Sequence, residues 1–362
     1  MGNRIWNFNP GPSTLPFEAL EKAKADLPVY GNTGMAVMEL SHRSKEFLAI
    51  HEETKALLKT LFGVPDNFKI LFLQGGASLQ FAMVPMNLLG EGKSADYIVT
   101  GSWSKKALKE GKIIGSVKTA ASSEETKFNR IPKQGELKLD PNAVYCHITS
   151  NNTIAGTQFA EFPETGKVPL IADMSSDILS RAVDFNKFGL IYAGAQKNLG
   201  PAGLTVVIIR DDLVEASRKD IPTMLQYGTH VDNDSMFNTP PTYSIYLMKL
   251  VLEWVKGQGG LAGMEKRNQE KADLLYNAID GNNGFYKGAA EKDSRSKMNV
   301  TFRLPAEELE AKFIADAKTV GFGGLKGHRS VGGIRVSMYN ALEPQGIKEL
   351  TAFMNEFAKK NG

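Results

Sequence analysis

Short, continuous runs of apolar residues alternate with amphipathic segments between residues 69 and 210. A strand that is apolar along its whole length is covered on both faces, as in a parallel sheet between two layers of helices. The pattern therefore predicts an α/β domain with a mostly parallel sheet flanked by helices. The predicted strands are 69–76 (KILFLQGG), 96–101 (DYIVTG), 143–150 (AVYCHITS), 169–176 (PLIADMSS) and 205–210 (TVVIIR).

The pattern changes after residue 243. Two long helical segments, SIYLMKLVLEWVKGQGG and GLAGMEKRNQEKADLLYNAID, are separated by a glycine-rich break. We predict a large domain over 16–260 and a smaller α+β domain over 261–362, joined by the N-terminal segment 1–15. The elements expected in the smaller domain are strands at 298–304 and 333–339, a helix near 306–319 and a last helix near 344–360.

The composition is that of a globular protein, with 42% hydrophobic and 23% charged residues in 362. The 43 basic and 40 acidic residues are interspersed, so the net charge of +3 does not indicate a nucleic-acid surface. The single cysteine, Cys146, excludes an intrachain disulfide and a cysteine-rich metal site, and we expect no metal. Without a long apolar stretch, we expect a cytoplasmic protein that does not bind membranes.

Candidate chemistry lies where the predicted strands end. Gly75-Gly76-Ala77-Ser78 closes one strand and opens a helix, an arrangement suited to an anion, although a tight turn would explain it equally well. Asp173 ends another apolar run, where a carboxylate needs a cation, a hydrogen-bond donor or a helix-capping role. Lys197 follows 24 residues later in IYAGAQKNLGPAGL and is either a solvated loop lysine or a nucleophile.

These residues fit one chemistry. An aldehyde cofactor would be held by the lysine, its phosphate by the helix N-terminus, and its pyridinium nitrogen by the aspartate. Trp103, at a further strand end, would offer a flat face for stacking, although a core or surface tryptophan is the alternative.

Six motifs resemble the phosphoserine aminotransferase family. This is a family of pyridoxal 5'-phosphate (PLP) enzymes of fold type I, the aspartate-aminotransferase fold. The resemblance extends over essentially the whole chain and implies a homodimer with active sites at the subunit interface. The motifs are FNPGPSTLP, ELSHRSKEF, GSWSKKA, ADMSSDILSR, YAGAQKNLGPAG and HRSVGGIRVSMYNA.

The resemblance implies a role for each matching residue. Lys197 would be the Schiff-base lysine and Asp173 the partner of the pyridine nitrogen. Some members carry arginine where this chain has Ala77, so its anion contacts are expected to be distributed differently. The other implied cofactor contacts are Trp103 on the ring, Thr153 on the phenolic oxygen, Gly76, Ala77 and Gln196 on the phosphate, and Asn238-Thr239 on the phosphate from the other subunit.

The substrate side can be argued from residues as well. Arg335 lies in an apolar strand, where a guanidinium needs an anion, and a substrate α-carboxylate fits its two parallel donors. The resemblance places His42-Arg43 and His328-Arg329 near the distal anion of the substrate, the second pair donated by the neighbouring subunit. Taken singly, each of these pairs would more often be a surface pair.

The resemblance implies transamination of 3-phosphohydroxypyruvate by L-glutamate, giving O-phospho-L-serine and 2-oxoglutarate in serine biosynthesis. It leaves open 4-phosphohydroxy-L-threonine, of pyridoxine biosynthesis, as a second substrate.

The residues give less support to several other functions. An alanine–glyoxylate aminotransferase would not need the His-Arg pairs, and a cysteine desulfurase needs a mobile cysteine, whereas Cys146 lies in an apolar run. A catalytically silent phosphate-binding protein would not require Lys197 or Asp173. A nicotinamide dehydrogenase lacks support because no GxGxxG follows a predicted strand.

Overall fold

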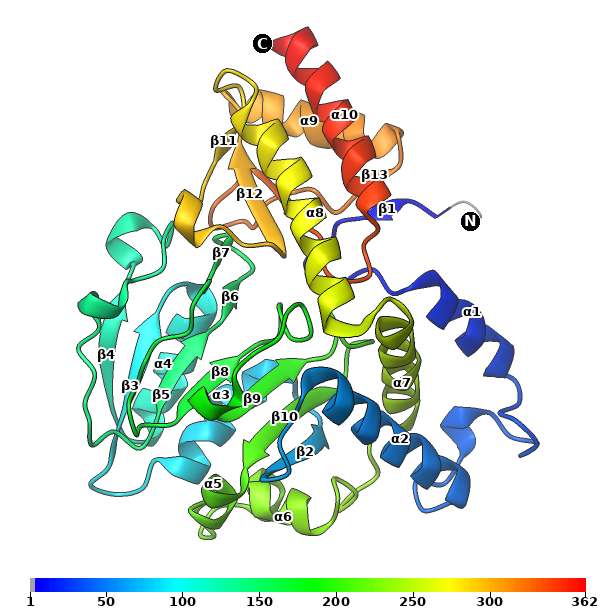
Figure 1. Ribbon diagram of the computed structural model, residues 1–362, viewed down its shortest axis with the longest axis vertical. Helices are drawn as coiled ribbons and strands as arrows, with labels where there is room; N and C mark the ends of the chain where they lie inside the picture. The colour runs from blue at the N-terminus through cyan, green and yellow to red at the C-terminus, as the bar shows by residue number, and fades with distance from the viewer. Residues whose placement is uncertain (1–3) are drawn as a thin grey trace.

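A seven-stranded sheet forms the centre of the larger part of the computed structural model, which describes residues 4–362 (Figure 1). Only β10 runs antiparallel to its two neighbours, so the sheet is mixed but mostly parallel, as predicted. The strand order is β2 (Phe68–Leu73), β10 (Thr205–Arg210), β9 (Phe188–Gly194), β8 (Leu170–Asp173), β5 (Cys146–Thr149), β3 (Ser94–Val99) and β4 (Ser116–Ser122).

Helices cover both faces of this sheet. One face packs against α3 and α4 through residues such as Phe81 and Ala107, and the other against α2 and α7 through residues such as Phe47 and Leu250. This explains why β8 and β9 are buried along their whole length. The helices of this part are α1 (Phe17–Asp26), α2 (Lys45–Phe62), α3 (Gly76–Leu88), α4 (Ser102–Ile114), α5 (Asp211–Glu215), α6 (Tyr227–Asp232) and α7 (Thr242–Gly257).

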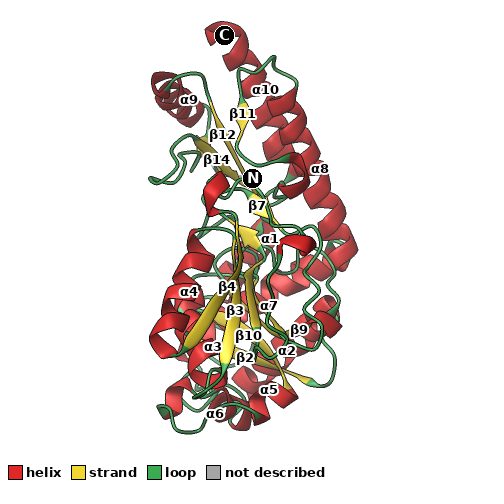
Figure 2. Cartoon of the chain, turned by 90° about the vertical axis from the view of Figure 1, so that its left-hand side faces the viewer, coloured by secondary structure: helices red, strands yellow, loops and turns green. Residues whose placement is uncertain are grey.

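A smaller α+β part follows, with a three-stranded antiparallel sheet in the order β11–β12–β14 (Figure 2). Its apolar core is a separate cluster that also contains Phe8 from the N-terminal segment. On this separation of cores we propose the division at residue 260, where α8 begins. The elements are α8 (Gly260–Asp280), β11 (Lys287–Gly288), β12 (Asn299–Arg303), α9 (Glu307–Thr319), β13 (Phe322–Gly323), β14 (Ile334–Ser337) and α10 (Pro344–Asn361).

Two short pairings complete the fold. β1 (Trp6–Asn7) pairs with β13, which ties the N-terminal segment to the C-terminal part, and β6 (Asn151–Asn152) pairs with β7 (Thr157–Gln158). Strand β4 was not predicted, because its sequence SVKTAAS lies at the sheet edge, largely open to solvent, and so lacks a continuous apolar run. Over residues 4–362, none of the helices combines the length and apolarity that crossing a membrane requires.

Candidate active site

Lys197 lies just beyond the carboxyl end of β9, at the edge of the sheet where the other parallel strands also end. Its Nζ donates a hydrogen bond to Thr153 Oγ1 at 2.7 Å. The N-terminal segment lies over it, because Ser13 Oγ donates to the Lys197 carbonyl oxygen at 2.7 Å, and a Cβ on Gly11 would lie 3.3 Å from Lys197 Cγ. Lys197 is therefore enclosed by the fold and is not a solvated loop lysine.

Burial lowers the pKa of Lys197 to about 8. The neighbouring charges act in both directions, since Asp173 raises this pKa and Arg335 lowers it. About a tenth of this amine is then neutral at pH 7, far more than for an ordinary lysine, and the neutral form is the one that attacks a carbonyl or accepts a proton.

This pKa predicts that Lys197 reacts with amine reagents at a lower pH than an ordinary lysine does. Since only the neutral amine is nucleophilic, labelling of Lys197 by a small amine-selective reagent should rise with pH with a midpoint near pH 8. Exposed Lys118, whose pKa is raised by its hydrogen bond to Asp140, should be labelled only at higher pH and serves as the control. Peptide mass spectrometry over a pH series measures both. Lys197 labelling that begins no earlier than that of Lys118 would contradict the prediction.

Asp173 is the last residue of β8 and is 5% exposed. Its Oδ1 accepts hydrogen bonds from the Ser175 amide at 3.0 Å and the Ser175 hydroxyl at 2.6 Å. Over residues 4–362 no hydrogen-bond partner is found for Oδ2. Burial raises the pKa of Asp173, although the Ser175 hydrogen bonds and Lys197 act in the opposite direction. The hydrogen bonds from Ser175 satisfy Oδ1 of Asp173, and Oδ2 is available to a protonated ligand.

The glycine turn after β2 opens α3 with free backbone N–H groups. Gly75 and Gly76 have φ of 87° and 64°, and a Cβ on Gly75 would lie 2.5 Å from Leu79 Cδ2, so the turn requires glycine there. Ala77 follows in the first turn and is partly exposed. The helix N-terminus thus offers donors and partial positive charge to an anion.

Trp103 lies in the first turn of α4, after the end of β3. Its ring is partly buried, and its Nε1 has no hydrogen-bond partner in the described part of the chain. Lys106 Nζ lies 4.2 Å from the centroid of the Trp103 ring. A flat aromatic face is therefore present at the same sheet edge as Lys197 and Asp173.

Arg335 lies on β14 and is 7% exposed. Its Nε has no hydrogen-bond partner, and it makes no ion pair among residues 4–362. Burial lowers its pKa, and its charge in turn lowers that of Lys197, so the two groups are close. A buried guanidinium without a counter-ion is suited to binding a carboxylate with two parallel hydrogen bonds.

His328 lies close to this arginine in the same chain. Burial lowers the pKa of His328, and the charges of Arg335, Arg329 and Lys106 lower it further. Its Nδ1 is 2.7 Å from Ser330 Oγ. The prediction that His328-Arg329 serves the active site of the neighbouring subunit stays a prediction.

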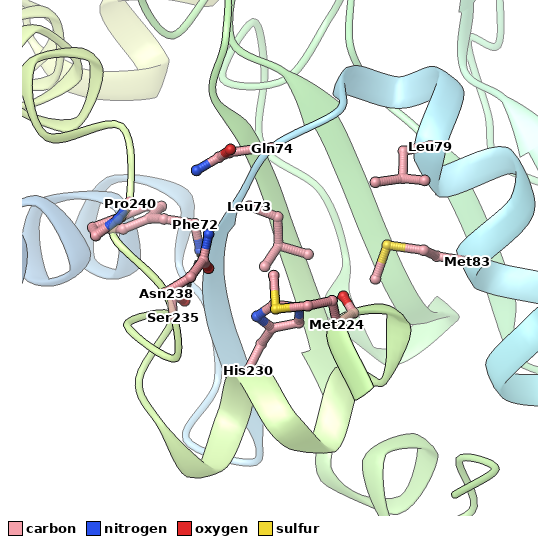
Figure 3. Close-up of a pocket in the computed structure, with 10 residues that line it drawn as sticks. All are labelled: Phe72, Leu73, Gln74, Leu79, Met83, Met224, His230, Ser235, Asn238 and Pro240. Carbon is pink, nitrogen blue, oxygen red and sulfur yellow. Dashed lines mark hydrogen bonds between the residues drawn. The ribbon is translucent and has the colours of Figure 1, made fainter. Parts of the chain in front are cut away.

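Other expected site residues are not brought together within one chain. His42-Arg43 precedes α2 and forms no hydrogen bond or ion pair with Lys197, Asp173 or Arg335 among the described residues. Asn238-Thr239 lies near the end of β2, where Gln74 Nε2 donates to the Thr239 carbonyl oxygen at 3.3 Å. Asn238 lines a pocket of about 70 Å³ together with Gln74 (Figure 3), and neither Lys197 nor Asp173 lines it.

Sequence reasoning missed the residues that position the site. Ser175 holds Asp173, and its only signal was a hydroxyl two residues after a strand-end aspartate. Tyr339 donates to the Pro10 carbonyl oxygen at 2.7 Å and accepts from Asn299 Nδ2 at 3.2 Å. Pro10 lies 329 residues away along the chain, so no local pattern could have revealed this contact.

A family model described as "Aminotransferase class-V" matches residues 5–350 of the chain. The chain belongs to this aminotransferase family. It is 59% identical to the phosphoserine aminotransferase of Geobacillus kaustophilus, over 99% of each chain. The solved phosphoserine aminotransferase of Bacillus circulans subsp. alkalophilus matches with a TM-score of 0.98 and 55% identity, over 99% of each chain. A PLP-bound phosphoserine aminotransferase of Trichomonas vaginalis matches with a TM-score of 0.93 and 40% identity, over 97% of this chain and 100% of that one.

Proposed function

We propose that this class-V aminotransferase is a phosphoserine aminotransferase. It transfers the amino group of L-glutamate to 3-phosphohydroxypyruvate, giving O-phospho-L-serine and 2-oxoglutarate, in a reversible reaction that serves L-serine biosynthesis. The observation that carries the proposal is the unpaired, buried Arg335, whose charge acts on Lys197, in a chain 59% identical to a phosphoserine aminotransferase along almost its whole length.

The residues present fit PLP as the cofactor. The free Oδ2 of Asp173 suits a protonated pyridine nitrogen, and the neutral amine of Lys197 suits the aldehyde carbon. Thr153, which now accepts from Lys197 Nζ, would bind the phenolic oxygen, and Trp103 would stack on the ring. The phosphate would be held by Gly76 and Ala77 at the start of α3, by Gln196 next to Lys197, and by Asn238-Thr239 of a second subunit.

In the mechanism, Lys197 transfers the proton of the substrate Cα, and Asp173 holds a proton on the ring nitrogen of the cofactor. When bound, the cofactor supplies an electron sink for the pair left when a proton leaves the substrate Cα. Lys197 Nζ, with a pKa of about 8, takes that proton and returns it at the adjacent carbon. Asp173 Oδ2 keeps a proton on the ring nitrogen. The segment around Gly11 and Ser13 covers Lys197 and limits the access of water to this amine.

Both substrates carry an α-carboxylate and a distal anion. Arg335 binds the α-carboxylate, and His42-Arg43 and His328-Arg329 bind the distal phosphate or carboxylate. Support comes from the surroundings of His328, whose pKa is lowered by burial and by the charges of Arg335 and Arg329. The same groups would also accept 4-phosphohydroxy-L-threonine, which carries both anions.

A homodimer with active sites at the interface is part of the proposal. Neither Asn238-Thr239 nor His42-Arg43 forms a hydrogen bond with Lys197 among residues 4–362, and apolar side chains close to them in the sequence are open to solvent. Phe237 is 46% exposed and Met38 53% exposed, which supports a covered surface in the assembled enzyme. A cytoplasmic location is also proposed and is consistent with the single free, buried Cys146.

A coupled assay with L-glutamate and 3-phosphohydroxypyruvate tests the function. We expect turnover by the wild type, and Arg43→Ala and Arg329→Ala should each raise the KM for the phosphorylated substrate about 10- to 100-fold, because a charge-assisted hydrogen bond is lost. L-Alanine, which lacks a distal anion, is the control substrate in a half-reaction followed by the absorption of the cofactor.

The outcomes separate the parts of the proposal. Alanine reacting as well as glutamate would indicate a different aminotransferase. Unchanged KM values in both arginine variants, with normal wild-type turnover, would leave the reaction in place and show that the distal-anion site is wrong.

A further inference from the structure

The cationic side chains near Trp103 and Arg335 lack acidic partners. Among residues 4–362, Lys106, Arg329 and Arg335 form no ion pair. Lys105, next to Lys106 on α4, does form one, with Glu124 at 2.5 Å. The charges of all three unpaired cations reach His328 and lower its pKa. The region therefore holds a concentration of positive charge that the protein itself does not neutralise.

Lys106 is the member of this group to which no role has been given. It lies on α4, one turn after Trp103, and its side chain is exposed. Its Nζ is 4.2 Å from the Trp103 ring centroid, so a cation–π contact holds the ammonium at the edge of the site. Such a contact leaves the positive charge available, whereas the carboxylate of Glu124 compensates that of Lys105.

We propose that Lys106 binds the distal phosphate of the substrate and favours a phosphorylated substrate over one with a distal carboxylate. The inference depends on the proposed function, because it assigns Lys106 to the same distal-anion site as His328 and Arg329. Coulombic attraction scales with the charge of the ligand, so a cation at this place stabilises a phosphate dianion more than a carboxylate. Lys106 thereby strengthens the binding of 3-phosphohydroxypyruvate more than that of L-glutamate.

The test compares Lys106→Gln with Lys105→Gln, a matched control one residue earlier on the same helix. Lys106→Gln should raise the KM for 3-phosphohydroxypyruvate about five- to tenfold and that for L-glutamate less than about twofold, as expected for the loss of one partly screened charge. Lys106→Arg should restore the wild-type preference. Raising the ionic strength should reduce the difference between wild type and Lys106→Gln.

Cofactor absorption in Lys106→Gln, with the same intensity and position as in the wild type, should show that stacking on Trp103 is intact. Unchanged KM values in Lys106→Gln would overturn the inference. So would an equal rise for both substrates, or the same rise in Lys105→Gln. A wild-type enzyme that does not aminate 3-phosphohydroxypyruvate would instead overturn the proposed function.

Discussion

Lys197→Ala should abolish transamination. The variant loses both the amine that binds the cofactor and the group that moves the Cα proton, and proton transfer by a positioned side chain alone contributes about 100- to 10,000-fold. We expect kcat to fall by at least about 10,000-fold, because the nucleophile and the general base are the same group. The visible absorption of the covalently bound cofactor should disappear from the purified protein.

A control variant separates this effect from general damage. Lys187 lies shortly before β9 and pairs with Glu164 on the surface, so Lys187→Ala should retain both the absorption and the turnover. Thermal unfolding of both variants without cofactor checks that each one folds. A coloured and active Lys197→Ala protein would refute the assignment of Lys197.

The strand ends that carry the site could be predicted because a strand buried on both faces is a continuous run of apolar residues in the sequence. The run PLIADMSS became β8 ending at Asp173, and TVVIIR became β10. The carboxyl ends of parallel strands meet at one sheet edge, so Asp173 and the loop after β9 had to be neighbours. The chemistry of Lys197 and Asp173 followed from their residue types, whereas the substrate depended on the resemblance.

The rest of the site depends on contacts that no local pattern encodes. Gly11 and Ser13 cover Lys197 although Ser13 lies 184 residues away along the chain, and Tyr339 donates to Pro10 from 329 residues away. In our proposal Asn238-Thr239 and His328-Arg329 reach the active site of a second subunit, so the sequence of one chain does not show where they lie relative to Lys197. The edge strand β4 could not be predicted either, because it is largely exposed and its sequence therefore contains no continuous apolar run.

Asp173→Asn should lower kcat strongly with little effect on KM. The variant keeps the shape of the side chain but loses the negative charge that would hold a proton on the ring nitrogen, so the electron sink is weakened in the transition state. We expect kcat to fall about 100- to 10,000-fold, in the range found when a preorganised electrostatic or acid–base group is removed. Asp173 also raises the pKa of Lys197, so labelling of Lys197 should begin at lower pH in this variant.

Stability distinguishes this loss of activity from misfolding. Since burial raises the pKa of Asp173 in the folded state, its charged form opposes folding, and the contribution of this group to stability falls as pH rises from its ordinary pKa through the raised value. Asp173→Asn without cofactor should therefore unfold at the same or a slightly higher temperature than wild type at neutral pH. Asp177→Asn is the matched control, because Asp177 is equally buried but both its oxygens accept hydrogen bonds, from Ser150 and Gln158. Burial raises the pKa of Asp177 as well, but asparagine offers only one acceptor oxygen to the two donors, so that variant should lose stability. An Asp173→Asn protein that unfolds like Asp177→Asn would assign Asp173 a structural role.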